Sequence, residues 1–312
     1  MIRPSLFIAI LLAFALQLAP AQAQLSRTFV SAASGNDTNN CDRPTPCRSF
    51  QGAHDKTNPD GEITVLDPGG YGAVTITKSI SIVDDGVGEA SVLVSGGVTG
   101  ITITAGAASY VNLRGITIQG IGFGGGTGLV FNSGFSLTMS NCVVRNLTHD
   151  GIVFAPNAPS GSANLAVSNT LVADNGGNGI NVQPAGAIFR VNVVLNRVEA
   201  YQNSGAGILA DGSASPMSTE IWVNAMGSTS GNNGGAGFAT RTAAGRASPS
   251  MQVLGSQSVT NGGFGLEANG GGILVGQSGV IANQAGQATG FVVSYGDNYS
   301  EGGHFPFTIG KF

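Results

Sequence analysis

The sequence predicts an all-β fold, a right-handed parallel β-helix built as a solenoid of three-stranded coils. The first observation is a glycine that recurs after an Asn/Gly-rich turn and opens a short apolar run, at spacings of 28, 23, 28, 28, 30, 28 and 25 residues. A period of this size is typical of stacked repeats, in which each unit buries its apolar face against its neighbours. These glycines are Gly100, Gly128, Gly151, Gly179, Gly207, Gly237, Gly265 and Gly290.

The second observation is the pattern within each unit. Copies such as SLTMSNCVVRNLTHDGIVF and NLAVSNTLVADNGGNGINV contain three short runs of alternating apolar and polar residues, separated by turns, and they lack helical periodicity. Three short strands cannot bury their apolar faces alone, whereas coils stacked at ~4.8 Å enclose a continuous core. An asparagine in the tight turn, at Asn141, Asn169, Asn196 and Asn224, predicts either a stack of side-chain amides or a left-handed turn residue, with a local bulge at Asn196.

Composition is the third observation. The chain has 50 glycines in 312 residues, 42% hydrophobic residues and 10% charged residues. Disordered chains combine low hydrophobicity with high net charge, so this composition indicates a folded, turn-rich β protein. The net charge of −4, without a cluster of Lys or Arg, argues against nucleic acid as a partner.

The N-terminus has the pattern of a secretory signal peptide. Arg3 precedes an apolar stretch at 6–18, and Ala21-Gln22-Ala23 is a small-residue cleavage site. We expect cleavage near Ala23, no transmembrane segment afterwards, and a secreted, periplasmic or cell-envelope location. The predicted organisation is a signal peptide at 1–23, an N-terminal cap at 24–60, the β-helix at 61–293 and a C-terminal cap at 294–312.

The predicted N-terminal cap contains a short helix and a cysteine pair. Thr45 is the expected helix N-cap, Pro46 the first helical residue, and Phe50 and Ala53 the residues that face the first coil. In an exported protein, Cys41 and Cys47 of CDRPTPC can close a disulfide, the alternative being a reduced pair in a turn. No His lies near either cysteine, which disfavours zinc.

The segments TFVSAASGNDTNNCDRPTPCRSF and GGYGAVTITKSISIVDDG, together with the SNxxV repeats, resemble secreted bacterial right-handed parallel β-helix repeat proteins of the pectate-lyase-like superfold. This superfold includes polysaccharide lyases and hydrolases, adhesins and phage tail proteins, so the resemblance implies a fold more than an activity. In its enzymes the substrate lies along the strand after the Gly/Asn turn. The outward residues of that strand are therefore the place to look for a site.

We expect the residue after each glycine to face the core, at Ile152, Ile180, Ile208, Phe238, Leu266 and Phe291. The outward polar residues then gather in the C-terminal half. Asp211 and Arg241 occupy the same position in adjacent coils. In a functional interpretation Arg241 is a carboxylate clamp or a lyase base, and Asp211 holds Arg241 or a cation. In the alternative they form an exposed ion pair that contributes ~0–1 kcal/mol to stability. The candidate catalytic residues are Asp211, Arg241 and Glu267, and the candidate binding residues are Asn181, Gln183 and Asn269.

The catalytic signals are weak. The backbones of Asp211 and Glu267 are expected ~12 Å apart, whereas glycosidase carboxyls lie ~5 Å or ~6.5–9.5 Å apart. His149-Asp150, in a turn, is either a general base or surface decoration. No cofactor is evident in the sequence, and Ca²⁺ is expected only if the protein is a lyase. The dense acidic group of Asp84, Asp85 and Glu89 lies in an early loop, away from the polar face.

Two functions are left open. The first is a scaffold that binds a polysaccharide or cell-surface glycan, or serves as a cell-envelope or adhesion module, without a recognisable catalytic centre. The second is a polysaccharide lyase or glycoside hydrolase that acts on the solvent face of one parallel sheet.

Overall fold

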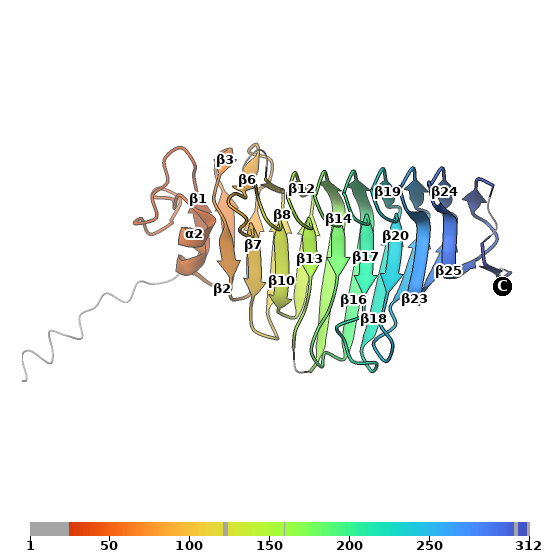
Figure 1. The fold of residues 1–312 in the computed structure, drawn as a ribbon. Helices are drawn as coiled ribbons and strands as arrows, with labels where there is room; N and C mark the ends of the chain where they lie inside the picture. The colour runs from red at the N-terminus through yellow and green to blue at the C-terminus, as the bar shows by residue number, and fades with distance from the viewer. Residues whose placement is uncertain (1–24, 121–123, 159, 303–304, 311–312) are drawn as a thin grey trace, which may run out of the picture.

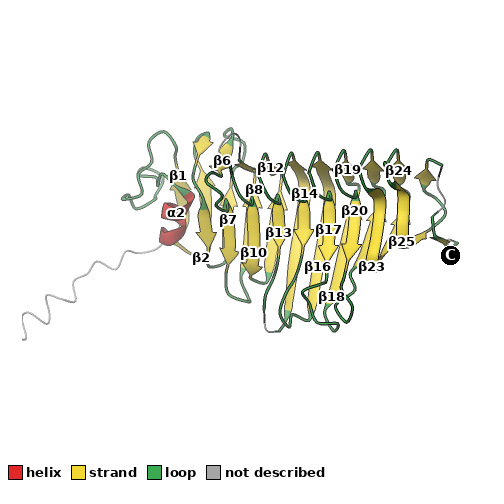
Figure 2. Cartoon of the chain, in the orientation of Figure 1, coloured by secondary structure: helices red, strands yellow, loops and turns green. Residues whose placement is uncertain are grey.

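The computed structural model describes residues 25–120, 124–158, 160–302 and 305–310, so the predicted signal peptide lies outside the described residues. These residues form an elongated parallel β-solenoid with its two ends far apart (Figures 1 and 2). Each coil passes in turn through three sheets that run along the solenoid axis, and each strand pairs in parallel with the equivalent strand of the next coil. The predicted solenoid of three-stranded coils is thereby confirmed.

The strands fall into three sheets, which we call sheets 1, 2 and 3. Sheet 1 contains β1 (Leu25–Val30), β2 (Thr57–Val65), β5 (Ile80–Val83), β8 (Tyr110–Arg114), β11 (Ser136–Ser140), the starts of β14 (Ser162–Ala173) and β16 (Arg190–Tyr201), β18 (Glu220–Met226), β21 (Ser250–Leu254), the ends of β23 (Phe264–Gly276) and β25 (Gly286–Ser294), and β27 (Phe307–Thr308). Sheet 2 contains β3 (Gly69–Gly70), β6 (Ala90–Leu93), β9 (Ile116–Gln119), β12 (Val143–Arg145), the ends of β14 and β16, β19 (Thr229–Gly231), β22 (Gln257–Val259), β24 (Gly279–Ile281) and β26 (Tyr299–Ser300). Sheet 3 contains β4 (Val74–Ile76), β7 (Ile101–Thr104), β10 (Leu129–Ser133), β13 (Ile152–Phe154), β15 (Ile180–Val182), β17 (Ile208–Asp211), β20 (Phe238–Arg241) and the starts of β23 and β25.

The residue after each recurring glycine faces the core in five of the six predicted coils. Its members are fully buried at Ile152, Ile180, Ile208, Phe238 and Leu266. Phe291 is the exception, because its side chain is 58% exposed. In this last coil Ala288 pairs with Leu266, and the register shifts before Val292 pairs with Ile273. Val292 therefore enters the core and Phe291 points outward, so the predicted core position of Phe291 is wrong.

The tight turn between sheets 1 and 2 contains one residue with left-handed backbone geometry. Asn141 and Asn169 occupy this position with φ of 54° and 47°, and Arg197 follows with 52°. Asn196 and Asn224 lie within strands instead, where they pair with Ser168 and Val194. The prediction for those two residues, including the bulge at Asn196, is therefore wrong. Asparagine occurs in this turn because the turn requires a left-handed backbone conformation, which Asn tolerates better than most residues.

A buried ladder of asparagines does exist, in the other turn, between sheets 2 and 3. Each side-chain amide donates to Oδ1 of the next asparagine at 2.8–2.9 Å. The glycine four residues later lies against this ladder: a Cβ on Gly237 would lie 2.8 Å from Nδ2 of Asn261. The recurring glycine is therefore required by close packing. The ladder consists of Asn175, Asn203, Asn233, Asn261 and Asn283.

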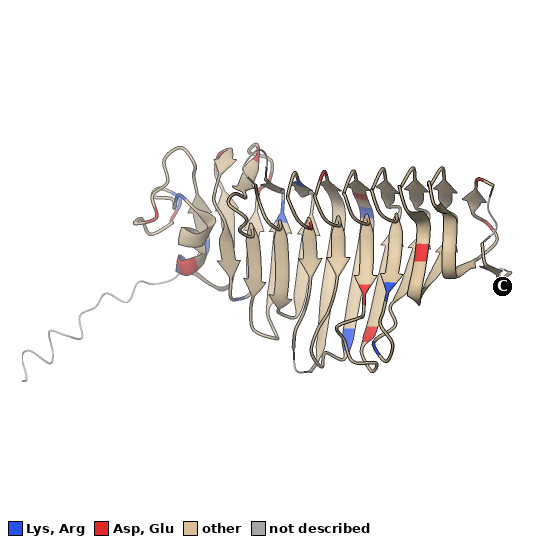
Figure 3. Ribbon diagram, viewed as in Figure 1, with Lys and Arg blue, Asp and Glu red and all other residues tan. Residues whose placement is uncertain are grey.

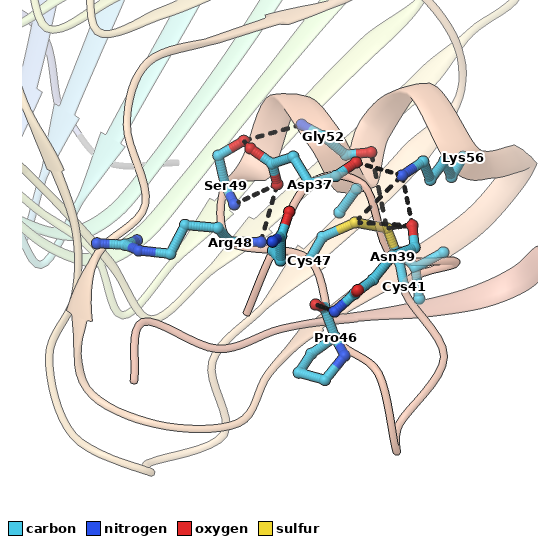
Figure 4. The surroundings of a disulfide bond; sticks show 12 residues. Asp37, Asn39, Cys41, Pro46, Cys47, Arg48, Ser49, Gly52 and Lys56 are labelled. Atoms are coloured by element: carbon cyan, nitrogen blue, oxygen red, sulfur yellow. Dashed lines mark hydrogen bonds between the residues drawn. A yellow bond between two sulfur atoms is a disulfide. The ribbon is translucent and has the colours of Figure 1, made fainter. Parts of the chain in front are cut away.

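The N-terminal end of the solenoid is covered by helix α2 (Phe50–Lys56), in which Phe50 and Ala53 are buried as predicted. The N-cap is Ser49, whose hydroxyl accepts from the N–H of Gly52, so the predicted start at Thr45 and Pro46 is wrong. Helix α2 begins after Ser49 because the carboxylate of Asp37 accepts hydrogen bonds from the N–H groups of Arg48 and Ser49 (Figure 4). This interaction holds the chain extended up to the cap.

The predicted disulfide between Cys41 and Cys47 is present, with a Cα–Cα distance of 4.7 Å (Figure 4). Both residues are fully buried beneath helix α2. At the opposite end, β26 and β27 extend sheets 2 and 1 by one further pair of strands. Within the described part of the chain, no helix is long and apolar enough to cross a membrane.

Candidate functional site

The outward face of sheet 3 carries a polar row at the ends of β17 and β20 and at the end of the sheet 3 part of β23. Asp211 pairs with Arg241, and Arg241 pairs with Asn269, so three polar residues lie side by side on adjacent coils. The register follows from the glycine period, because the three residues lie at the same distance from the recurring glycines Gly207, Gly237 and Gly265. Asp211, Arg241 and Asn269 are thus brought together as the sequence predicts for one outward position.

The interaction between Asp211 and Arg241 is loose. Nη1 of Arg241 lies 3.8 Å from Oδ2 of Asp211, and the two side chains are 53% and 19% exposed. The other carboxylate oxygen of Asp211 accepts from the N–H of Ser213 at 2.9 Å, which holds the carboxylate at the strand end. The carboxylate of Asp211 is therefore held in place, whereas the guanidinium of Arg241 extends into solvent. Such a pair contributes ~0–1 kcal/mol to stability and can be exchanged for a ligand group.

The outward position two residues earlier is covered in the middle coils. Leu209 and Ala239 are 3% and 5% exposed because Ala206 and Ala236, from the preceding turns, pack over them in a small apolar cluster. A buried apolar cluster thus lies on one side of the polar row. In the next coil Glu267 occupies the same position as Ala239 and remains partly exposed.

Asn181 and Gln183, both predicted as binding residues, are in contact with each other. Nδ2 of Asn181 donates to Oε1 of Gln183 at 3.2 Å and to Oδ2 of Asp150 at 2.8 Å. Asn181 is only 6% exposed, whereas Gln183 is half-buried at the end of its strand. The carboxylate of Asp150 also accepts from the N–H of Asn178 at 2.6 Å. Asp150 therefore orders the turn before sheet 3, and Asn181 supports Gln183 from below.

The candidate catalytic carboxylates are not neighbours. Strand β20 lies between β17, which carries Asp211, and β23, which carries Glu267, and the two residues are offset by two positions along the sheet. In the described ranges, no group of three His, Cys, Asp or Glu side chains converges to hold a metal ion. In the early acidic loop, Asp84 accepts from the N–H groups of Gly86 and Val87.

Trp222 is an exposed aromatic residue on sheet 1 that was not predicted from the sequence as part of a site, because the candidate residues came only from the strand after the Gly/Asn turn, which belongs to sheet 3. In the strand EIWVNAM of β18, Ile221, Val223 and Ala225 are buried and Trp222 is 45% exposed. It is the only tryptophan of the chain. The alternation of apolar and polar residues places it on the outward face, so this signal was available in the sequence.

Figure 3 shows that charged residues are sparse along the solenoid, most of which is tan. Around Trp222 they include Arg190 and Glu220, whose side chains form an ion pair of 2.5 Å. These residues line a shallow depression of about 430 Å³ together with Asn192, Trp222 and Asn224. Sheets 1 and 3 therefore present two different outward surfaces.

A family model described as a right handed beta helix region matches residues 62–221, just over half of the chain. Among solved structures, pectate lyase Pel9A is similar with a TM-score of 0.62 and 18% identity, over 91% of this chain and 82% of that one. A GH136 lacto-N-biosidase from Eubacterium ramulus gives a TM-score of 0.45 and 10% identity, over 97% and 69% of the two chains. Pectin methylesterase PemA from Erwinia chrysanthemi gives 0.44 and 10%, over 90% and 92%.

A comparison with curated protein sequences found no significant match. Structural similarity at such low identity establishes the fold alone, because one fold supports many activities. The three-sheet solenoid and the match over residues 62–221 agree. The chain belongs to the right-handed β-helix family.

Proposed function

We propose that this protein is an exported glycan-binding β-helix that binds an extended polysaccharide along the outward face of sheet 3. The observation that carries the proposal is the row of Asp211, Arg241 and Asn269 on three adjacent strands. A row of this kind runs along the solenoid axis with a step of ~4.8 Å. It therefore suits a linear polymer better than a small, compact ligand.

The side chains of the row give the proposed ligand its chemistry. Arg241 supplies guanidinium donors that bind carboxylates and hydroxyl groups. Its 3.8 Å separation from Asp211 leaves those donors open to a sugar carboxylate. Asn269 is exposed and offers both a donor and an acceptor. A polysaccharide that contains acidic sugars is the ligand class that this surface fits best.

Export is part of the proposal. The disulfide between Cys41 and Cys47 is consistent with an oxidising compartment, where such bonds persist. The pectate lyase named above shares the fold, so a polysaccharide ligand is compatible with this architecture. The proposal therefore places this glycan-binding module in a secreted, periplasmic or cell-envelope location.

The test is a binding titration of mature protein with polygalacturonate, alginate and a neutral glucan. We expect the acidic polymers to bind, and Arg241→Ala to weaken their affinity by about tenfold or more, as expected when a desolvated charge contact is lost. Arg114→Ala is the matched control: this arginine is also paired, at 2.9 Å to Asp85, and is 55% exposed. Unchanged affinity in Arg241→Ala, or equal loss in both variants, would contradict the proposed site.

The alternative function is a polysaccharide lyase or glycoside hydrolase on the same face. It is favoured by one observation, the half-exposed Arg241 beside the carboxylate of Asp211. The same polysaccharides, incubated with and without added Ca²⁺, are assayed for unsaturated products and for reducing ends. Product release that is abolished by Arg241→Ala in a folded variant would replace the binding function with the enzymatic one.

A further inference from the structure

A second row of residues runs along the outward face of sheet 1 and does not involve sheet 3. It crosses β8, β11, β14, β16, β18, β21 and the end of β23 in continuous register, and Phe291 of β25 extends it because its ring lies against Gly272. We call it the sheet 1 row. Its members are Tyr110, Ser136, Asn164, Asn192, Trp222, Ser250, Gly272 and Phe291.

Three exposed aromatic rings mark the two ends and the middle of the sheet 1 row. Tyr110, Trp222 and Phe291 are 53%, 45% and 58% exposed. The two outer rings are held by other aromatic residues: the ring centroids of Tyr110 and Phe135 are 5.1 Å apart, and those of Phe291 and Phe307 are 5.3 Å apart. With a step of ~4.8 Å per strand, Trp222 lies ~19 Å from Tyr110 and ~14 Å from Phe291. The three rings therefore lie at long intervals along one line, and the two outer rings are held in place.

Small and amide side chains fill the intervals. Nδ2 of Asn192 donates to Oδ1 of Asn164 at 3.0 Å, and Nδ2 of Asn164 donates to the carbonyl of Phe135 at 3.3 Å. These bonds orient both amides and leave acceptor capacity on Asn192. On the other side of Trp222, Ser250 has a small side chain and Gly272 has none, so neither protrudes from the sheet. The ring of Phe291 lies against Gly272. Hydrogen-bonding groups and ring faces thus alternate along the row.

The sheet 1 row contains no charged residue. The nearest charges along the strands, Arg190 and Glu220, lie two residues before Asn192 and Trp222 and neutralise each other as an ion pair. Sugar rings present apolar C–H faces and peripheral hydroxyl groups, which match aromatic faces and amides. We propose that the sheet 1 row binds an extended, uncharged polysaccharide, with Trp222 stacking on a sugar ring. This site goes beyond the proposed function, because it is on a different sheet and selects a neutral glycan.

Trp222 is its own reporter, because the chain has one tryptophan. We expect its fluorescence emission to change saturably on titration with at least one of cellohexaose, xylohexaose and mannohexaose, and to stay constant with hexagalacturonate. In isothermal titration, Trp222→Ala should weaken binding of the responding sugar by about tenfold or more. Phe291→Ala is a second variant, and it applies even if Trp222→Ala does not fold. Circular dichroism confirms the fold of each.

Two controls establish whether a loss of affinity is specific to the sheet 1 row. Tyr299→Ala removes a ring that is 68% exposed on sheet 2, outside the row, and should leave the affinity unchanged. Arg241→Ala should also leave the affinity for the neutral sugar unchanged. The sheet 1 row is therefore tested separately from the proposed site on sheet 3. The inference is overturned if none of the three neutral sugars binds, if Phe291→Ala and Trp222→Ala bind as the wild type does, or if Tyr299→Ala loses affinity equally. It is also overturned if Trp222 emission changes with protein concentration alone, since the row would then be covered by a second copy.

Discussion

The side-chain amide of Asn203 donates a 2.9 Å hydrogen bond to Oδ1 of Asn233, one coil further along the solenoid. The backbone N–H of Asn203 donates to the same oxygen at 3.0 Å. Nδ2 of Asn233 in turn donates to Oδ1 of Asn261 at 2.9 Å. Every ladder oxygen after that of Asn175 therefore satisfies two buried donors of the preceding coil, which couples neighbouring coils through their interior.

Asn233→Ala should strongly destabilise the solenoid. It leaves two donors of Asn203 unpaired at a site where both residues are 1% exposed. An unsatisfied buried group costs about 1–3 kcal/mol, so we expect the free energy of unfolding to fall by about 2–5 kcal/mol. The measurement is the urea midpoint by far-ultraviolet circular dichroism. Asn224→Ala, on the outward face of sheet 1, is the control and should change stability by less than about 0.5 kcal/mol. Equal midpoints for the two variants would contradict the ladder's role.

Gly237→Ala should destabilise the protein through steric overlap. The added Cβ would lie 2.1 Å from Oγ of Ser258 and 2.8 Å from Nδ2 of Asn261. We expect a loss of about 1–3 kcal/mol, as for other overpacked cores, measured by thermal and urea unfolding. Removing the hydroxyl in the double variant Gly237→Ala/Ser258→Ala should recover part of the loss. The control is Gly106→Ala, where the nearest atom is 3.5 Å away. A neutral effect of Gly237→Ala would show that this turn adapts easily.

Thiol titration should count one free cysteine, and only after unfolding. Of the three cysteines, Cys41 and Cys47 are bonded to each other. Cys142 is buried, and burial raises the pKa of its thiol to about 11. At pH 8 the native protein should therefore resist a thiol reagent, because the thiolate is the reactive form. In urea without a reductant, one thiol per chain should react. Rapid reaction of the native protein, or three reactive thiols without reduction, would be inconsistent with this arrangement.

Stability should fall in mild acid because of His54, a buried residue of helix α2. Its Nε2 accepts from the N–H of Thr77 at 3.3 Å, and burial lowers the pKa of its ring, opposed by the nearby carboxylate of Asp55 and assisted by Lys78. The unfolded chain then takes up a proton first, at pH ~6.5. The stabilisation is therefore complete above that pH and is lost as the pH falls from there through the folded pKa.

The pH dependence is measured as the urea midpoint between pH 8 and pH 4.5. His54→Gln should flatten the slope between pH 6.5 and pH 4.5, whereas His149→Gln, in an exposed turn, should not. Asp37 and Asp67 also have lowered pKa values, because hydrogen bonds to their carboxylates outweigh burial. Their contribution is lost only around and below their ordinary value of 3.8, outside this window. A slope that persists in His54→Gln would assign the effect to another group.

Much of the candidate site on sheet 3 could be predicted from the sequence. The pairing of Asp211 with Arg241 follows from counting residues after Gly207 and Gly237, because identical offsets place side chains on the same row. Accessibility could not be predicted in the same way. Leu209 and Ala239 are covered because Ala206 and Ala236 fold back over them, which depends on the path of the turns between coils.

The errors lie where coil length varies or where the repeat ends. Asn196 and Asn224 match the spacing of the turn but lie in strands, because successive coils place the tight turn at slightly different distances. The repeat predicts Phe291 in the core, but the chain shifts register at the last coil. The N-cap at Ser49 depends on the carboxylate of Asp37, a contact between segments that no local pattern reveals.

The sequence by itself determined the solenoid, because the glycine period and the two-residue alternation are local properties that each coil repeats. The tertiary structure alone decided which turn asparagines are buried as a ladder and which outward residues reach solvent. It also aligned Tyr110, Trp222 and Phe291 from distant coils into one row. The physical reason is that burial and alignment are set by the stacking of coils, whose register depends on the turns and loops between strands.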